Sequence, residues 1–123
     1  MNTLIPILLA AFVLYKLLYP VLSGQLSYKN FKELLSSDQP PVILDVRTAS
    51  EYKSGHIEGA RNIPYDKLPK GLGKKIAGKD SSIVVYCHSG SRSGAASRAL
   101  KSAGYSNVQN FGAISRWKEP LKC

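Results

Sequence analysis

The sequence predicts an α/β domain in which a central, mostly parallel sheet is flanked by helices in a three-layer arrangement, preceded by one apolar helix. Two observations predict the sheet. Residues 42–46 and residues 82–86 are short, nearly continuous apolar runs, which are typical of strands buried on both faces. Helical patterns follow these runs, and strands that alternate with helices favour a parallel sheet.

The first element is an almost wholly apolar segment, residues 4–22, interrupted by Pro6, Lys16 and Pro20. As a helix it would be about 30 Å long, close to the hydrocarbon thickness of a bilayer. We therefore expect a transmembrane anchor, or an uncleaved signal-like segment, over residues 1–22 and a separate domain over residues 23–123. A cleaved signal peptide and a buried core helix are the alternatives.

The distribution of lysines predicts the orientation of this anchor. Lys16, Lys29 and Lys32 end or follow the apolar span, and no basic residue precedes it. The positive-inside rule then predicts a single-pass membrane protein whose domain faces the cytoplasm. A cleaved signal peptide would instead place the domain in the periplasm or outside the cell, but such peptides normally open with positive charge.

The next two helices have recognisable start signals. Residues 28–35 have the apolar spacing of a short amphipathic helix, and Ser27 precedes them as an N-cap. After the first strand, Thr48 and Glu51 have the spacing of a capping box. A short helix is expected from there to about Gly55.

The last part of the chain contains a longer helix and a further strand. Alanine and leucine recur at helical spacing through residues 95–103, and Gly104 lies where a C′ glycine belongs. Residues 107–111 are expected to form a third strand. Residues 114–118 are expected to form a final helical turn or two.

The composition narrows the classes of function. The chain has 17 Lys plus Arg against 8 Asp plus Glu, an excess that suits anionic partners of several kinds. The sequence has no recognisable nucleic-acid-binding motif and no basic stripe interleaved with aromatic residues, so we expect no nucleic-acid partner. Two cysteines are too few for a disulfide-stapled scaffold, which favours a working thiol.

The sequence that follows the second buried strand is the candidate site. Cys87 ends the strand, and the loop that leads into the next helix consists of His88, Ser89, Gly90, Ser91, Arg92 and Ser93. In an open α/β sheet the ligand site lies just past the carboxyl ends of the strands. Backbone N–H groups of such a loop form a cradle for a small anion.

The same donors, the helix dipole and the charge of Arg92 favour the thiolate of Cys87, which is the reactive form of cysteine. From the residues alone, Cys87 is also consistent with an inert buried cysteine at a strand end. His88 is either a general base or a solvent-facing loop residue. Arg92 either contacts an anion or clamps the loop.

Three stretches of the sequence together resemble the rhodanese family. The first is Asp45-Val46-Arg47, then Glu51-Tyr52 and residues 55–64 (GHIEGARNIP); the second is residues 87–93; the third is Gly104-Tyr105 through Val108, Phe111-Gly112 and Trp117. They cover about residues 27–119 in the order and spacing of that family. Ala113 stands where a second glycine is usual.

The resemblance implies a rhodanese-like domain that transfers a sulfane sulfur from thiosulfate or a similar small anionic donor. Cys87 would take the sulfur as a persulfide and pass it to a thiol, cyanide or protein acceptor. The residues 88–93 would bind the donor. By the same resemblance Asp45, Arg47, Glu51 and His56 are mainly structural, with the pocket rim as a second expectation for Arg47.

Two other functions compete with sulfur transfer. Phosphatases or arsenate reductases use a similar loop, but the related cell-cycle phosphatases have five residues between cysteine and arginine, and four separate Cys87 from Arg92. A non-catalytic docking or persulfide-sensing module is the other alternative.

No cofactor or metal site is expected, because the two histidines and two cysteines show no ligand spacing. Cys123 is interpreted as a spare thiol on the tail, with a resolving role for the Cys87 persulfide as the alternative.

Overall fold

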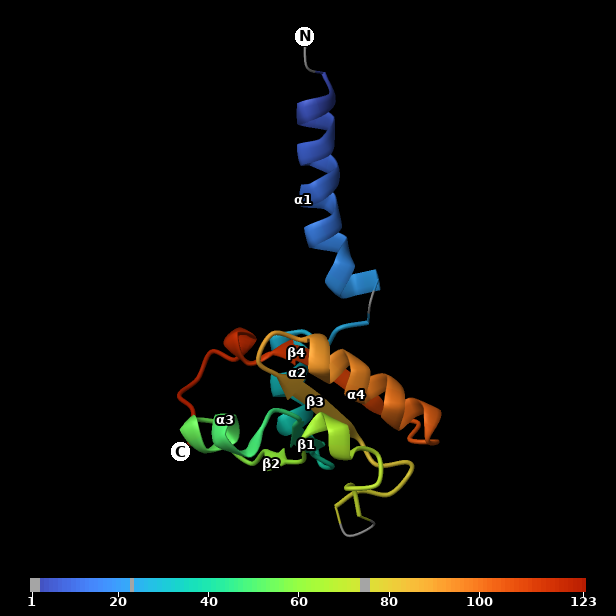
Figure 1. Cartoon of the computed structure of the whole chain (residues 1–123), viewed down its shortest axis with the longest axis vertical. Coiled ribbons are helices and arrows are strands. Elements are labelled where there is room, and N and C mark those ends of the chain that lie inside the picture. The colour runs from blue at the N-terminus through green and yellow to red at the C-terminus, as the bar shows by residue number, and fades with distance from the viewer. Residues whose placement is uncertain (1–2, 23, 74–75) are drawn as a thin grey trace.

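The computed structural model describes residues 3–22, 24–73 and 76–123, and its centre is a parallel sheet of four strands in the order β2-β1-β3-β4 (Figure 1). The strands are β1 (Val42–Asp45), β2 (Arg61–Asn62), β3 (Ile83–Cys87) and β4 (Val108–Ala113). All three strand pairs are parallel. The helices are α1 (Leu4–Leu22), α2 (Tyr28–Leu35), α3 (Ala49–Ser54) and α4 (Ser91–Ser102), with short 3₁₀ turns at Tyr65–Lys67 and Ile114–Arg116.

Helices cover both faces of the sheet, as the three-layer prediction required. On one face, Ala96 and Leu100 of α4 pack in a cluster with residues of β1 and β3. On the other face, Phe31 of α2 is fully buried beside Phe111 of β4, with ring centroids 4.9 Å apart. All five residues of β3 are buried, which explains its continuous apolar sequence.

The capping signals read from the sequence are confirmed. Ser27 Oγ accepts a hydrogen bond from the N–H of Asn30 at the start of α2. Thr48 and Glu51 form a complete capping box at the start of α3. Each pair satisfies backbone donors that a helix leaves unpaired at its first turn.

Other element boundaries differ from the expectation in informative ways. β3 spans Ile83–Cys87, one residue later at each end than the apolar run 82–86, so the strand carries the thiol to the edge of the sheet. The two-residue strand β2 was not expected, because its sequence has no strand pattern of its own. It pairs with β1 at Leu44 and Asp45.

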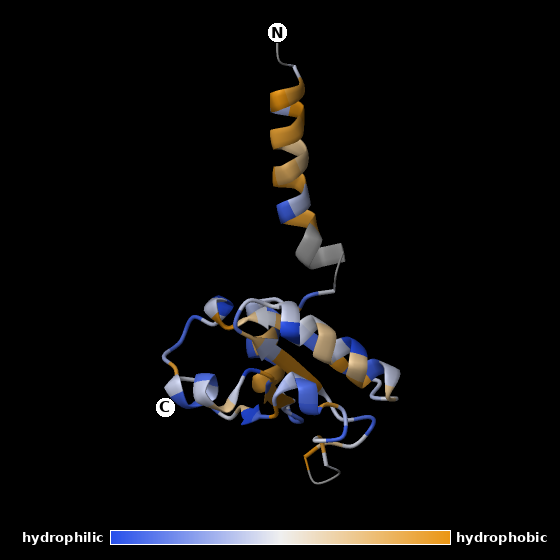
Figure 2. Ribbon diagram, viewed as in Figure 1, coloured by the Kyte–Doolittle hydropathy of each residue, from blue (hydrophilic) through white to orange (hydrophobic). Residues whose placement is uncertain are grey.

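The N-terminal segment forms the expected helix, but not a membrane span. Figures 1 and 2 show α1 standing away from the sheet, with apolar residues along it. Among the residues described, no helix is both long and apolar enough to cross a membrane. The predicted single-pass membrane localisation with a cytoplasmic domain is therefore wrong, and the transmembrane anchor on which it depended is unsupported.

The physical reason is the length of the apolar run that precedes the first charged residue. Residues 4–15 precede Lys16, and a helix of that length rises by about 18 Å, well short of a hydrocarbon core of about 30 Å. The predicted boundary between the two segments, at Ser23, lies outside the described residues.

A buried polar network joins β1 to β3 at their carboxyl ends. The Tyr86 hydroxyl donates to Asp45 Oδ2 at 2.8 Å and accepts from the N–H of Ile57 at 3.1 Å. Arg47 pairs with the same carboxylate, with Nη2 2.6 Å from Oδ2. Burial is the main reason that the pKa of Tyr86 is raised, so its hydroxyl keeps its proton and remains a donor.

We predict that Tyr86→Phe lowers the free energy of unfolding by about 1–3 kcal/mol, because the N–H of Ile57 loses its buried partner. Urea denaturation followed by circular dichroism measures this change. Tyr105→Phe is the matched control, since Tyr105 is also buried and no described residue hydrogen bonds to its hydroxyl. Equal losses in the two variants would contradict the role given to the network.

Candidate active site

The candidate site lies at the carboxyl end of β3, where the strand gives way to the loop that begins α4. Cys87 is the final residue of β3 and is fully buried. Its neighbours in the sheet are β1 and β4, so the thiol lies at the edge where parallel strands all end. The fold therefore places the one buried cysteine among the described residues where open α/β sheets bind ligands.

Two backbone N–H groups of the loop point at the sulfur of Cys87. Gly90 N lies 3.0 Å and Ser93 N lies 3.3 Å from Sγ. Sγ also lies 3.5 Å from Ser93 Oγ, and that hydroxyl donates to the carbonyl of Gly90. Donors arranged in this way stabilise negative charge on sulfur.

The turn of the loop depends on glycine. Gly90 is the N-cap residue of α4 and has φ +105°, a conformation that residues with a Cβ rarely adopt. This turn brings the N–H groups of Gly90 and Ser93 to the same side of the loop. The side chains of His88 and Ser89 are exposed, so these residues contribute backbone rather than side chain to the inner surface.

Arg92, in the first turn of α4, is held by Glu51 of α3. Its Nη1 lies 2.7 Å from Oε1 and its Nη2 lies 3.0 Å from Oε2, so the pair is bidentate. This contact, together with the N–H of Thr48, lowers the pKa of Glu51 to about 2. The guanidinium is thus fixed beside the Cys87 loop by a carboxylate that stays ionised at neutral pH.

Three of the residues expected to be structural hold the backbone around the site. Asp45 and Arg47 form the buried pair described above, and Arg47 Nη2 also donates to the carbonyl of Gly55 at 2.7 Å. Arg47 is buried, which removes it from the pocket rim. The His56 ring stacks on Tyr52, with centroids 3.8 Å apart, and its Nδ1 donates to the Tyr52 carbonyl.

Sequence reasoning missed two features of this region. The Glu51 pair with Arg92 spans 41 positions, and neither residue carries a local signal of the other. The structure also has a polar pocket beside the loop, and Arg98 and Lys101 of α4 are among the residues that line it. Both side chains are exposed on α4, and the sequence pattern of a helix gives no sign that they border a pocket.

The two cysteines are free thiols, and Cys123 is exposed, with its Sγ 3.7 Å from the carbonyl of Ser54. Among the described residues, no group of three or more His, Cys, Asp or Glu side chains is placed to hold a metal ion. The groups described at the site are the Cys87 thiol, the backbone donors around it and the guanidinium of Arg92.

Two known proteins that are similar to this chain in sequence have related names. Thiosulfate sulfurtransferase PspE of Escherichia coli is 34% identical over 71 residues, which cover 58% of this chain and 68% of that protein. Thiosulfate:glutathione sulfurtransferase of Saccharomyces cerevisiae is 32% identical over 106 residues, which cover 74% of this chain and 75% of that protein. Both are sulfurtransferases by name.

The fold agrees with the sequence. The structure of the human single-domain sulfurtransferase TSTD1 matches with a TM-score of 0.67 and 27% identity, covering 76% of this chain and 94% of that chain. The model of the rhodanese-like domain family matches residues 27–120, from the N-cap of α2 to just past the last 3₁₀ turn. The chain belongs to the rhodanese family.

Proposed function

We propose that this protein is a sulfurtransferase that moves a sulfane sulfur from thiosulfate or a similar donor to a thiophilic acceptor through a persulfide on Cys87. The observation that carries the proposal is the pair of N–H groups, from Gly90 and Ser93, within 3.3 Å of Sγ. The names of the sulfurtransferase relatives support the same reaction.

In the first half-reaction the Cys87 thiolate attacks the outer sulfur of thiosulfate. A bond forms between Sγ and that sulfur, the S–S bond of thiosulfate breaks, and sulfite leaves with its electron pair. The negative charge passes from Sγ to the outer sulfur of the persulfide. Backbone N–H groups of residues 88–93 are suited to hold both the dianionic donor and the persulfide anion.

Arg92 belongs to this loop and carries a positive charge. Because Glu51 holds it in a bidentate pair, we propose that Glu51 is a positioning residue and that Arg92 helps to neutralise the donor. His88 is exposed, and we assign it no role as a general base.

Phosphate-ester chemistry is the runner-up. The four residues between Cys87 and Arg92 form a shorter ring than the five of the related phosphatases, which suits a single sulfur atom better than a tetrahedral phosphate. This spacing is the reason to test thiosulfate first.

Thiocyanate formation from thiosulfate and cyanide tests the proposal on the full chain. We expect turnover by the wild-type protein and a loss of at least about a thousandfold in Cys87→Ser, because no persulfide can form. Cys123→Ser is the matched control and should retain turnover. Wild-type protein that is inert to thiosulfate but hydrolyses p-nitrophenyl phosphate would contradict sulfur transfer and favour the phosphatase alternative.

A second prediction concerns the carboxylate that positions Arg92. The pKa of Glu51 lies below its ordinary value, so its ion pair stabilises the fold above about pH 4.5 and is lost as the pH falls through about 2. At neutral pH, Glu51→Gln should lower the free energy of unfolding by about 1 kcal/mol, a value that allows for solvent screening of a pair whose side chains are 27% and 32% exposed.

Denaturant unfolding at several pH values measures this effect. The difference in the free energy of unfolding between wild type and Glu51→Gln should shrink from pH 5 towards about pH 2, since the Glu51 carboxylate becomes protonated there. Glu58→Gln is the control, because the ion pair of Glu58 is highly exposed and long, with Oε1 3.8 Å from Nζ of Lys122. A gap between Glu51→Gln and wild type that does not change with pH would argue against the ion pair as its source.

A further inference from the structure

The strand β4 is irregular beside the Cys87 loop. Its pairing with β3 passes from Asn110 directly to Gly112, which leaves Phe111 as an extra residue. Gly112 has φ +92°, a conformation that favours glycine. An extra residue of this kind forms a β-bulge, which bends a strand and redirects the residues that follow. The bulge therefore sets where the end of β4 lies relative to the loop.

The bulge lies directly against the glycine of the loop. A Cβ on Gly90 would lie 3.8 Å from Gly112 Cα and 3.9 Å from the backbone nitrogen of Ala113. Because neither glycine has a side chain, the two backbones approach closely. Gly90 is also the residue whose N–H lies 3.0 Å from Cys87 Sγ. The position of the bulge thus supports one of the two backbone donors to the sulfur.

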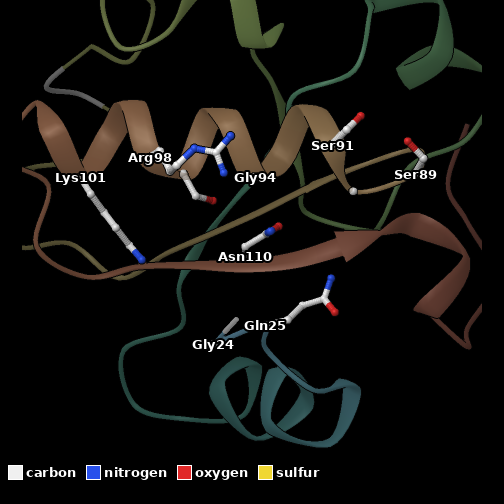
Figure 3. Close-up of a pocket in the computed structure, with 10 residues that line it drawn as sticks. Gly24, Gln25, Ser89, Ser91, Gly94, Arg98, Lys101 and Asn110 are labelled. Atoms are coloured by element: carbon white, nitrogen blue, oxygen red, sulfur yellow. The ribbon is translucent and has the colours of Figure 1, made fainter. Parts of the chain in front are cut away.

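The segment just before α2 packs against the same bulge, and we call residues 25–26 the strap. Figure 3 shows the side chain of Gln25 pointing toward β4, and a Cβ on Gly112 would overlap its amide nitrogen. The backbone N–H of Leu26 donates to the carbonyl of Asn110 at 2.8 Å. Gly112 is therefore in contact with both the strap and the loop.

Arg116 joins the strap to the bulge. Its Nη1 donates to the carbonyl of Leu26 at 3.1 Å and to the carbonyl of Phe111, the extra residue of the bulge. The guanidinium also lies over the Phe111 ring, 4.9 Å from its centroid. No carboxylate among the described residues forms an ion pair with Arg116. Its charged donors serve the two carbonyls, and such hydrogen bonds are stronger than neutral ones.

We propose that Arg116 is a positioning residue for the Cys87 loop, which acts through the strap and the bulge. By holding both, it keeps Gly112 against Gly90, and Gly90 then keeps its N–H directed at Sγ. Without this support the end of β4 opens locally, and negative charge on the sulfur loses part of its stabilisation. The inference concerns the thiol itself, and its consequence for sulfur transfer rests on the proposed function.

Hydrogen exchange of the full chain, followed by NMR, tests the positioning directly. Cys123→Ser serves as the background, so that Cys87 is the one cysteine left. Arg116→Gln should raise the exchange rate of the Gly90 amide by about tenfold, because two hydrogen bonds that hold the bulge are weakened. The buried N–H of Ile57 is the internal reference and should keep its wild-type rate.

The ultraviolet absorbance of the thiolate is the second readout, because it reports charge on the sulfur as well as an intact fold. It is measured at the pH where half of wild-type Cys87 is thiolate. In Arg116→Gln the ratio of thiolate to thiol should fall by about fivefold, as expected for one weakened hydrogen bond. The rate of persulfide formation from thiosulfate should fall with it.

Two controls and a second variant accompany Arg116→Gln. Arg61→Gln is the matched control, since Arg61 is exposed and forms no ion pair with any described residue. Gln25→Ala removes only the side chain that covers Gly112, and it should move both readouts in the same direction. Its control is Gln39→Ala, because Gln39 is exposed and lies outside the strap. Neither control should move either readout.

Unchanged readouts in a folded Arg116→Gln overturn the inference, and so does a change in only one of them. Equal acceleration of the Gly90 and Ile57 amides also overturns it, because Arg116 would then stabilise the whole domain rather than the loop. If Arg116→Gln does not fold, Gln25→Ala decides by the same criteria. Wild-type protein that takes no sulfur from thiosulfate contradicts the proposed function alone, since neither readout needs a sulfur donor.

Discussion

The account depends on the two hydrogen bonds that Gly90 and Ser93 donate through their backbone N–H groups to the sulfur of Cys87. They exist because a fully buried strand ends at the cysteine and the chain then turns through a glycine with positive φ into α4. Backbone donors in a turn of this kind are fixed before any ligand arrives, so charge on sulfur is stabilised without a costly rearrangement. The identities of the exposed loop side chains matter less to this chemistry than the path of the backbone.

Two contacts hold the loop in place, one just before Cys87 and one at the start of α4. Tyr86, the residue before Cys87, is tied to Asp45 of β1 by a buried hydrogen bond, and Arg47 completes that network. On the outer side, the bidentate pair of Arg92 with Glu51 joins the loop to α3. Buried polar groups that are this well paired rigidify the structure, which explains how a small domain can keep the Cys87 thiol in a defined position.

Much of this arrangement could be predicted from the sequence, because its determinants are local. The apolar runs of β1 and β3, the Ser27 cap and the Thr48 capping box each lie within a few residues, and the structure confirms them. The pair of Glu51 with Arg92 could not be predicted, since the partners meet only through the fold. The membrane prediction failed because it weighed the apolar content of residues 4–22 above the short run that precedes Lys16.

The central claim is that Cys87 carries the transferred sulfur, and the intact mass of the full chain before and after thiosulfate treatment tests it most directly. The account predicts that wild-type protein and Cys123→Ser each gain one sulfur atom, that a thiol or cyanide removes it, and that Cys87→Ser gains none. A folded, reduced protein that gains no sulfur would contradict the account. A gain that persists in Cys87→Ser would contradict it equally, because the sulfur would then reside elsewhere.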